Sequence, residues 1–348
     1  MTERFERMCD WLATCEPLKN QTYSQPVAAS SDASFRRYFR CEVASHTQTG
    51  QRHSYIIMDA PPSHEDCKPF IRVSEQLHAM GLNVPQVLAQ DLTLGFLLLS
   101  DLGNTTYLSV LNEQTVDGYY SDAFDALITL QQKGKAYQAT LPLYHETLLT
   151  NEMSLFSDWL CQSHLELSLG KLETQAWQSV QTHLIKSAQQ QPQNFVHRDY
   201  HSRNLMVTSE QANTGRNPGI LDFQDAVWGG VTYDVVSLIR DCYIKWPEEQ
   251  VKEWQRAYFL KACEGHLFLK NEWEGFVKAM DFMGVQRHLK AAGIFARLYH
   301  RDGKDGYLKD IPTTLSYIVE QASAYSELKD LAKLVENRVL PAMDNLKP

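Results

Sequence analysis

The chain has 348 residues, of which 43% are hydrophobic and 22% are charged, and its net charge is −9. These proportions are typical of a globular protein and exclude an intrinsically disordered chain. The acidic balance argues against a broad nucleic-acid-binding surface, which needs clustered Lys and Arg, and the longest strongly apolar run is far too short to span a bilayer.

The seven cysteines are an odd number and include no C-x-x-C pair. The N-terminus, MTERFERMCDWLATC, is charged and amphipathic rather than an apolar signal sequence. We therefore expect a reduced, cytoplasmic protein without a structural zinc site. The length also exceeds that of one ordinary hydrophobic core, so two lobes are expected.

Before about residue 100 most of the chain consists of short runs with strand character. Between two of these runs, Phe70, Val73 and Leu77 recur at helical spacing, and Gly81 is a suitable residue to end that helix. The pattern predicts a small, mainly antiparallel sheet with one packed helix. The predicted strands are FRRYFRCEV (35–43), HSYIIMDA (53–60), VPQVLAQ (84–90) and GFLLLS (95–100).

After Asp101 the hydrophobic period changes to that of a helix almost everywhere. Only two short apolar stretches, NLMV and GILDF, interrupt this helical part, and polar residues flank each of them. We predict two short strands there, ending in loops at the junction of the lobes. The predicted helices include DGYYSDAFDALITLQQ, NEMSLFSDWLCQSHLELSL, YDVVSLIRDCYIKW and VKEWQRAYFLKACEGHLFL.

The stretch FVHRDYHSRNLMV contains an Asp and, five residues later, an Asn. A kinase needs one carboxylate to orient the attacking hydroxyl and accept its proton, and further oxygen ligands to hold magnesium on the nucleotide phosphates. Asp199 is the candidate base, and Asn204 and Asp222 are the candidate metal ligands. A lone D-x-x-x-x-N would be a chance match, but HRD before it and the strand end ILDFQDA after it make the combination specific.

Asp234 stands at the start of the segment YDVVSLIRDCYIKW, whose apolar stripe is predicted to extend to Trp246. We expect the Asp234 carboxylate to cap this helix and to brace the loop that carries Asp199.

At these residues the chain resembles the kinase-like phosphotransferases, the superfamily of aminoglycoside phosphotransferases, choline kinases and protein kinases. The resemblance implies a bilobal, α+β, protein-kinase-like fold, with a nucleotide-binding lobe at 1–100 and a helical catalytic and acceptor-binding lobe at 101–348. It also implies ATP as co-substrate, Mg²⁺ as cofactor, and adenine binding to backbone groups near Ser100, Asp101 and Leu102. The alternative for LLLSDLG is a buried edge strand and turn.

Two departures from the superfamily pattern concern the nucleotide phosphates. The loop SSDASFRRYF contains no glycine, although small residues such as Ser34 would still let the backbone approach a phosphate. Met58 occupies the position of the third-strand lysine. A cation must then come from elsewhere if the phosphates bind as usual.

Arg36 and Arg37 are the nearest candidates for that cation. Neighbouring residues of a strand point to opposite faces, so at most one of them would face the nucleotide. Glu75, on the predicted helix, would position that arginine. Alternatively, both arginines are solvated and Glu75 belongs to an exposed helix face.

A closer resemblance is to the bacterial N-acetylmuramate/N-acetylglucosamine anomeric kinases of cell-wall recycling, which phosphorylate the C1 hydroxyl of an amino sugar to an α-1-phosphate. Alternatives are a phosphotransferase for an aminoglycoside or another alcohol, and a non-catalytic pseudokinase. The segments that carry this resemblance are SDASFRRYFR, MDAPPSHEDCKPF, NVPQVLAQD, GFLLLSDLGNTTYL, HRDYHSRNLM, ILDFQDAVWG and GIFARLYHRDGKDGYL.

An amino-sugar acceptor needs hydroxyl acceptors in its pocket and, for the lactyl carboxylate of N-acetylmuramate, a cation. Each candidate also has a plain structural reading, as a helix-start charge or as part of a solvated helix end. The expected partners are ATP and the sugar, with no nucleic acid, membrane or protein partner implied. The candidate acceptor-binding residues are Glu152, Arg198, Gln224, Asp225, Arg297, Arg301 and Lys304.

Overall fold

The computed structural model describes residues 3–31, 35–43, 53–209 and 214–345, and the chain divides into two compact units. Unit 1 comprises Met1–Thr105 and Leu205–Asp225, and unit 2 comprises Thr106–Asn204 and Ala226–Pro348. Among the described residues, no helix combines the length and the hydrophobicity needed to cross a membrane.

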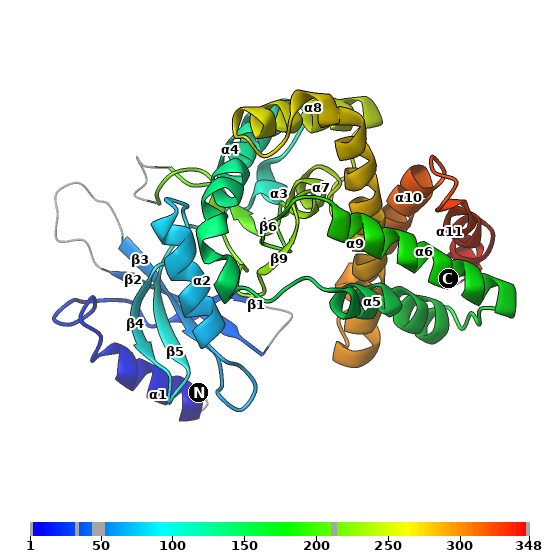
Figure 1. The fold of residues 1–348 in the computed structure, drawn as a ribbon. Helices are drawn as coiled ribbons and strands as arrows, with labels where there is room; N and C mark the ends of the chain where they lie inside the picture. Colours follow the sequence, from blue (N-terminus) through cyan, green and yellow to red (C-terminus); the bar gives the residue numbers. More distant parts are fainter. Residues whose placement is uncertain (1–2, 32–34, 44–52, 210–213, 346–348) are drawn as a thin grey trace. The chain divides into compact units, whose positions relative to one another are not determined.

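Unit 1 contains a five-stranded antiparallel sheet with the strand order β1-β2-β3-β5-β4 (Figure 1). β5 is buried along four of its five residues, as its apolar sequence FLLLS predicts. The predicted antiparallel sheet is confirmed. The strands are β1 (Val27–Ser31), β2 (Arg37–Val43), β3 (His53–Asp59), β4 (Val87–Asp91) and β5 (Phe96–Ser100).

One face of this sheet is covered by α1 (Glu3–Leu12), which the charged and amphipathic N-terminus forms. Met8 and Leu12 of α1 are fully buried in a cluster that includes Cys41 and Ile57 from neighbouring strands. Because side chains alternate along a strand, Met58 lies on the opposite face. The sheet is therefore buried on both sides, since Met58 is only 1% exposed.

The predicted helix after β3 is α2 (Lys68–Ala79), with a proline in its first turn and Phe70, Val73 and Leu77 buried. Gly81 follows the helix with a φ of +84°, and the N–H of Leu82 closes the end by donating to Leu77. A residue other than glycine would be strained at that φ, which explains why the helix ends there.

The segment Leu205–Asp225 belongs to unit 1, whereas a division at residue 100 had placed it in the second lobe. Its strands β7 (Leu205–Met206) and β8 (Gly219–Ile220) pair with each other. Asn83 ties this hairpin to unit 1, because its carbonyl accepts from Ile220 at 2.8 Å and its amide donates to two carbonyls of the 214–216 loop at 2.8 Å. These long-range hydrogen bonds leave no periodic signal in the sequence.

Unit 2 is mainly helical and packs around the 30-residue α9, which contacts α5, α6, α7 and α10 (Figure 1). It also contains a two-stranded antiparallel ladder of β6 (Gln193–Val196) and β9 (Val227–Gly230). The helices are α3 (Tyr107–Val110), α4 (Val116–Gly134), η1 (Lys135–Thr140), α5 (Glu146–Leu155), η2 (Phe156–His164), α6 (Lys171–Gln190), α7 (Tyr233–Ile239), α8 (Glu248–Glu264), η4 (Lys270–Glu272), α9 (Trp273–Asp302), η5 (Asp305–Asp310), α10 (Ile311–Ala322), α11 (Lys329–Leu334), η6 (Val335–Val339) and α12 (Leu340–Asn345).

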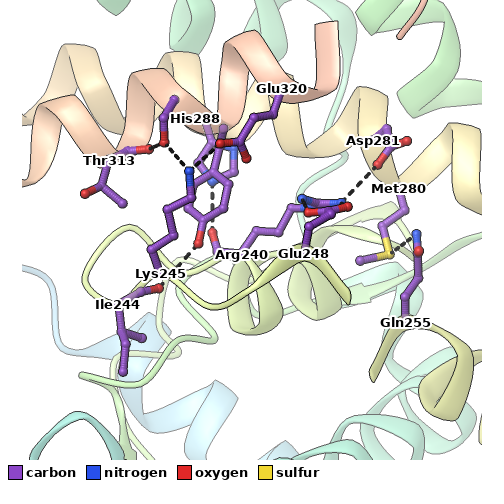
Figure 2. Close-up of polar contacts among 12 residues, drawn as sticks. Arg240, Ile244, Lys245, Glu248, Gln255, Met280, Asp281, His288, Thr313 and Glu320 are labelled. Carbon is purple, nitrogen blue, oxygen red and sulfur yellow. Dashed lines mark hydrogen bonds and ion pairs between the residues drawn. The ribbon is translucent and has the colours of Figure 1, made fainter. Parts of the chain in front are cut away.

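The helix predicted to extend to Trp246 ends earlier, at Ile239. Arg240 leaves the helical conformation, and its guanidinium donates to Glu248 at 2.8 and 3.0 Å and lies 3.7 Å from Asp281 (Figure 2). The imidazole of His288 bonds the Arg240 carbonyl at 2.9 Å, and burial lowers the pKa of His288 to about 3, so this ring is neutral. These contacts hold the chain away from the helical path that the apolar stripe alone predicts.

Candidate active site

The loop of residues 197–204, here called the catalytic loop, joins β6 to β7, and two carboxylates of unit 2 anchor it. Asp234, at the start of α7, accepts hydrogen bonds from the backbone N–H groups of His197 at 2.7 Å and Arg198 at 3.0 Å. Asp241 accepts from the backbone N–H and the hydroxyl of Ser202, at 2.9 and 2.5 Å. The catalytic loop is therefore fixed near both of its ends.

The bracing role predicted for Asp234 is confirmed, although its side chain does not cap α7, which begins after Thr232. Burial raises the pKa of Asp234 to about 7, even though both backbone donors favour the ionised form. The matching role of Asp241 was not predicted. The apolar stripe predicted Asp241 to lie inside a helix that continues to Trp246, whereas α7 ends at Ile239 and the chain then turns.

Asp199, the candidate base, lies in the middle of this anchored loop and its side chain is half-buried. Its backbone N–H donates to Nδ1 of His197 at 3.2 Å, and its carbonyl accepts from the Asn204 amide at 3.0 Å. Burial raises the pKa of Asp199, but the positive charges of Lys290 and Arg198 outweigh it, so the pKa lies below its usual range. The carboxylate is therefore ionised at neutral pH and able to accept a hydrogen bond from a hydroxyl.

Arg198 has a φ of +78°, a region that residues other than glycine rarely occupy. Asp234 holds its backbone N–H, and the carboxylate of Glu152 on α5 binds its guanidinium. Such strain persists only where the surroundings impose it, and it is common at functional sites. Arg198 thus sets the direction of the chain immediately before Asp199.

Glu152 was predicted to accept a hydroxyl of the sugar, but its carboxylate is only 5% exposed and is already occupied. Besides Arg198, it binds the Tyr144 hydroxyl, the Gln286 amide at 3.2 Å and the Lys290 ammonium at 3.3 Å. Burial raises the pKa of Glu152, but the positive charges of Lys290 and Arg198 lower it by more than burial raises it. The pKa of Glu152 therefore lies below its usual value. The four donors leave no place for a sugar hydroxyl, so this prediction is wrong and Glu152 positions the catalytic loop.

Lys290 was not predicted, although it contributes to the electrostatics of both Glu152 and Asp199. It is buried in the middle of α9, where its ammonium also donates to the Tyr233 hydroxyl at 3.2 Å. The available signal was the run QRHLK within a long helix whose neighbouring positions are apolar. Polar residues buried in such a helix need partners, and the sequence does not say which.

The two candidate metal ligands, Asn204 and Asp222, would bind a metal through side-chain oxygens, and a hydrogen bond holds each side chain. The Asn204 amide nitrogen donates to the Asp199 carbonyl, so the amide oxygen is the atom that would bind a metal. Asp222 has a φ of +61°, and the Gln224 amide donates to one of its carboxylate oxygens at 2.8 Å. An amide oxygen and a carboxylate suit Mg²⁺, which prefers hard oxygen ligands and keeps several waters.

Within the described residues no group of three or more His, Cys, Asp or Glu side chains is arranged to hold a metal. Gln224 was predicted to touch the acceptor; its amide nitrogen donates to Asp222, whereas its amide oxygen makes no hydrogen bond among the described residues, so this contact stays a prediction. Asp225 is exposed, and its contact with a substrate stays a prediction.

The stretch predicted to bind adenine ends β5, in unit 1. The Asp101 carboxylate is already occupied by Arg40 at 2.6 and 3.0 Å, by Ser54 at 2.7 Å and by the N–H of Gly103 at 2.9 Å. The Ser100 hydroxyl accepts from the N–H of Gln86 at 2.8 Å. These two side chains already have hydrogen-bond partners within the protein. Any contact with adenine would therefore come from the backbone, as expected from the sequence.

Arg36 and Arg37 differ in their surroundings, although only Arg37 lies on a strand, since β2 begins at Arg37. Arg37 binds Asp59 on the face covered by α1, where Arg4 of α1 also donates to Asp59 at 2.7 Å. Arg36 precedes β2 and lies 3.8 Å from a carboxylate oxygen of Glu65. Both arginines therefore have acidic partners in unit 1.

The prediction that Glu75 positions one of these arginines is wrong, because Glu65 and Asp59 are their partners and Glu75 is exposed on α2. Ser34, the small residue predicted to approach a phosphate, lies outside the described residues. Arg40 was not predicted. It lies on the same face of the sheet as Met58 and joins β2 to the end of β5.

The cations predicted for the acceptor pocket are at the C-terminal end of α9. Arg301 is exposed and is bound to its neighbour Asp302 through two hydrogen bonds of 2.8 Å. Arg297 is half-buried, and no hydrogen bond or ion pair to it is found among the described residues. Of these two arginines, only Arg297 keeps its donors for a ligand.

Comparison with known proteins identifies the class. The fold is similar to that of Plasmodium vivax ethanolamine kinase, with a TM-score of 0.61, 10% identity and coverage of 94% of this chain and 89% of that one. It is also similar to aminoglycoside phosphotransferase APH(2'')-Ib, with a TM-score of 0.56, 14% identity and coverage of 90% and 98%. The molecule thus has the predicted kinase-like fold, with a β-sheet unit and a helical unit.

The model of the phosphotransferase enzyme family matches residues 27–276. A kinase named for N-acetylmuramate and N-acetylglucosamine from Pseudomonas putida is 46% identical over 309 residues, which are 89% of this chain and 87% of the relative. Its namesake from Pseudomonas aeruginosa is 43% identical over 339 residues, 95% of this chain and 96% of the relative. The chain belongs to the phosphotransferase enzyme family and is an ATP-dependent kinase.

Proposed function

We propose that this kinase phosphorylates the anomeric C1 hydroxyl of N-acetylmuramate and N-acetylglucosamine, with ATP and Mg²⁺, to give α-1-phosphates for cell-wall recycling. The observation that carries the proposal is the identity of 46% and 43% with two kinases named for these sugars, over 89% and 95% of the chain. The expected partners are ATP and the amino sugar alone. The ionised Asp199 in an anchored loop supports the same chemistry.

In this proposal Asp199 orients the C1 hydroxyl and accepts its proton as the bond to phosphorus forms. An anomeric hydroxyl is more acidic than an ordinary alcohol. A carboxylate of low pKa is therefore a sufficient base when proton transfer accompanies bond formation. Glu152 and Asp234 keep Arg198 in its strained conformation, which fixes the position of Asp199.

Asn204 and Asp222 would hold Mg²⁺ through an amide oxygen and a carboxylate oxygen. When bound, the ion neutralises part of the charge on the nucleotide phosphates. Arg36 would supply a further positive charge, and the backbone near Ser100, Asp101 and Leu102 would bind the adenine. Among the cations that the sequence suggested for the acceptor, Arg297 makes no hydrogen bond or ion pair among the described residues, and Lys304 also stays a candidate.

The test is an acceptor panel with the purified protein, Mg²⁺ and ATP, in which release of ADP is measured. The panel contains N-acetylmuramate, N-acetylglucosamine and the aminoglycoside kanamycin, with the Asp199→Asn variant as the control for contaminating kinases. We expect ADP release with both amino sugars and none above background with kanamycin. Release with kanamycin alone, or with none of the three, would contradict the proposal.

A further inference from the structure

Arg203, the residue before Asn204 in the catalytic loop, stacks its guanidinium on aromatic rings and makes no ion pair among the described residues. Its central carbon lies over the ring of Tyr243, 3.9 Å from the ring centroid, and 5.3 Å from the ring centroid of Tyr307. Within the part of the chain that the structure describes, no carboxylate lies at ion-pair distance from it and none of its N–H groups makes a hydrogen bond. The group is half-buried and its donors are available.

The two tyrosines form a platform that is itself held in place. The backbone N–H of Tyr243 donates to Asp241, the carboxylate that also anchors Ser202, at 3.0 Å. Phe295 of α9 packs against both tyrosines, with ring centroids 5.9 Å from Tyr243 and 5.7 Å from Tyr307. Stacking on such rings orients a planar guanidinium and stabilises its charge, and leaves its N–H groups for another partner.

The other arginine of the catalytic loop is used differently. Arg198 binds the buried carboxylate of Glu152 and serves to position the loop. Arg240, which follows α7, is likewise bound to two carboxylates, those of Glu248 and Asp281. Arg203 stands four residues after Asp199 in the same loop. It makes no ion pair among the described residues, although Asp310 lies near enough for its carboxylate to interact with the Arg203 charge. A guanidinium whose N–H groups make no hydrogen bond among the described residues is suited to an anionic ligand.

We infer that Arg203 binds the carboxylate of the acceptor and so distinguishes N-acetylmuramate, which carries a lactyl carboxylate, from N-acetylglucosamine, which has none. The inference rests on the proposed function. A carboxylate matches the planar fork of a guanidinium with two parallel hydrogen bonds. Arg297 also lacks an ion pair among the described residues, but no aromatic ring is found stacked on it there, so its guanidinium is not oriented in advance.

The experiment compares kcat and KM for both sugars, and KM for ATP, in the wild type, Arg203→Gln and Arg203→Lys. Arg256→Gln is the matched control, because Arg256 also stacks on an aromatic ring, that of Trp273 at 4.7 Å, but lies on α8. We expect Arg203→Gln to lower the ratio of kcat/KM for N-acetylmuramate to that for N-acetylglucosamine by about tenfold to a hundredfold, the worth of a charged hydrogen bond. Most of the change should lie in KM for N-acetylmuramate, and Arg203→Lys should restore part of the ratio.

Thermal denaturation of each variant separates a loss of fold from a loss of binding, and a folded Arg203→Lys protein keeps the test valid if Arg203→Gln does not fold. An unchanged ratio, an equal loss with both sugars, or a rise in KM for ATP with either sugar would overturn the assignment of Arg203. So would a selective loss in Arg297→Gln that Arg203→Gln does not show. In all these cases a wild type active on both sugars leaves the proposed function standing, whereas an inactive wild type contradicts both.

Discussion

Asp199 is the residue on which the chemistry depends. We predict that Asp199→Asn lowers kcat by about 10²–10⁴, the usual worth of a positioned general base, while the affinity for ATP changes little. The fold should persist, because the Asp199 side chain is half-buried and Asn204 and His197 bind its backbone rather than its carboxylate. Steady-state kinetics and calorimetric titration with Mg-ATP measure the two quantities. A variant with near-normal kcat would remove Asp199 from this role.

Glu152 should matter for stability as well as for turnover. Glu152→Gln keeps the shape of the side chain but leaves Arg198 and Lys290 buried without their common counter-charge. Breaking a buried ion pair in this way costs about 3–5 kcal/mol, so the free energy of unfolding at pH 7 should fall by that order. Turnover should fall too, because Arg198 loses the contact that positions it. Urea denaturation measures the free energy of unfolding, and steady-state kinetics measure kcat. The control is Glu146→Gln, because Glu146 is exposed on the same helix.

The difference in the free energy of unfolding between wild type and Glu152→Gln should depend on pH, and the sign of this dependence follows from the pKa of Glu152. The folded pKa of Glu152 lies below its unfolded value, so the stabilisation is complete above the unfolded value, about 4.3 for a glutamate, and is lost as the pH falls through the folded pKa. The stability gap between wild type and Glu152→Gln should therefore be full at pH 7 and narrow below about pH 4. A gap that stays constant down to the acid transition would show that the Glu152 charge does not stabilise the fold.

At the scale of elements, the chain leading into β2 presents Arg36 and Arg37 to different surroundings. Arg37 shares Asp59 with Arg4 of α1, so Arg37→Ala should destabilise the contact between β2 and α1 without a large change in KM for ATP. Arg36 precedes β2 and has Glu65 as its acidic partner, and we predict that Arg36→Ala raises KM for ATP markedly. KM for ATP is measured for both variants at a saturating sugar concentration. If Arg37→Ala alone raises KM, the assignment is reversed, and if neither does, the phosphate contact lies elsewhere.

Elements with a strong local pattern were predicted well. The apolar runs of β3 and β5 and the helical spacing with Gly81 at the end of α2 gave their positions closely, because each pattern reflects burial of that segment alone. The end of α7 was missed, since the stripe continues to Trp246 while contacts of Arg240 turn the chain.

The candidate site likewise contains some residues that the sequence predicts and others that it does not. Asp199, Asn204 and Asp222 stand at recognisable spacings in short segments, so the sequence alone indicates them. Lys290 joins Glu152 only through the packing of α9 against α5, which a single sequence does not encode locally. Glu152 was predicted at a helix start, but α5 begins at Glu146, so Glu152 lies in the second half of that helix. Its contact was also assigned wrongly, because three of its four partners come from distant segments.

At the scale of the molecule, the residues of the kinase motif belong to both units. Asp199 and Asn204 are in unit 2, whereas Asp222 returns to unit 1 with the segment 205–225. We predict that ATP with Mg²⁺ raises the thermal denaturation midpoint of the wild type more than ATP alone, because a ligand that binds only the folded state stabilises it. In Asp222→Ala the Mg²⁺-dependent part of this rise should disappear. Equal shifts in both proteins would exclude Asp222 as a metal ligand.

The position of the transferred phosphate tests the central claim most directly. Purified protein is incubated with Mg²⁺, ATP and N-acetylglucosamine, and the product is examined by ³¹P and ¹H NMR. The account predicts one new phosphomonoester whose phosphorus couples to the anomeric proton, with the small proton–proton coupling of an α-linked sugar phosphate and with loss of the free reducing end. A phosphate coupled to the C6 protons with the reducing end intact, or no sugar phosphate at all, would contradict it.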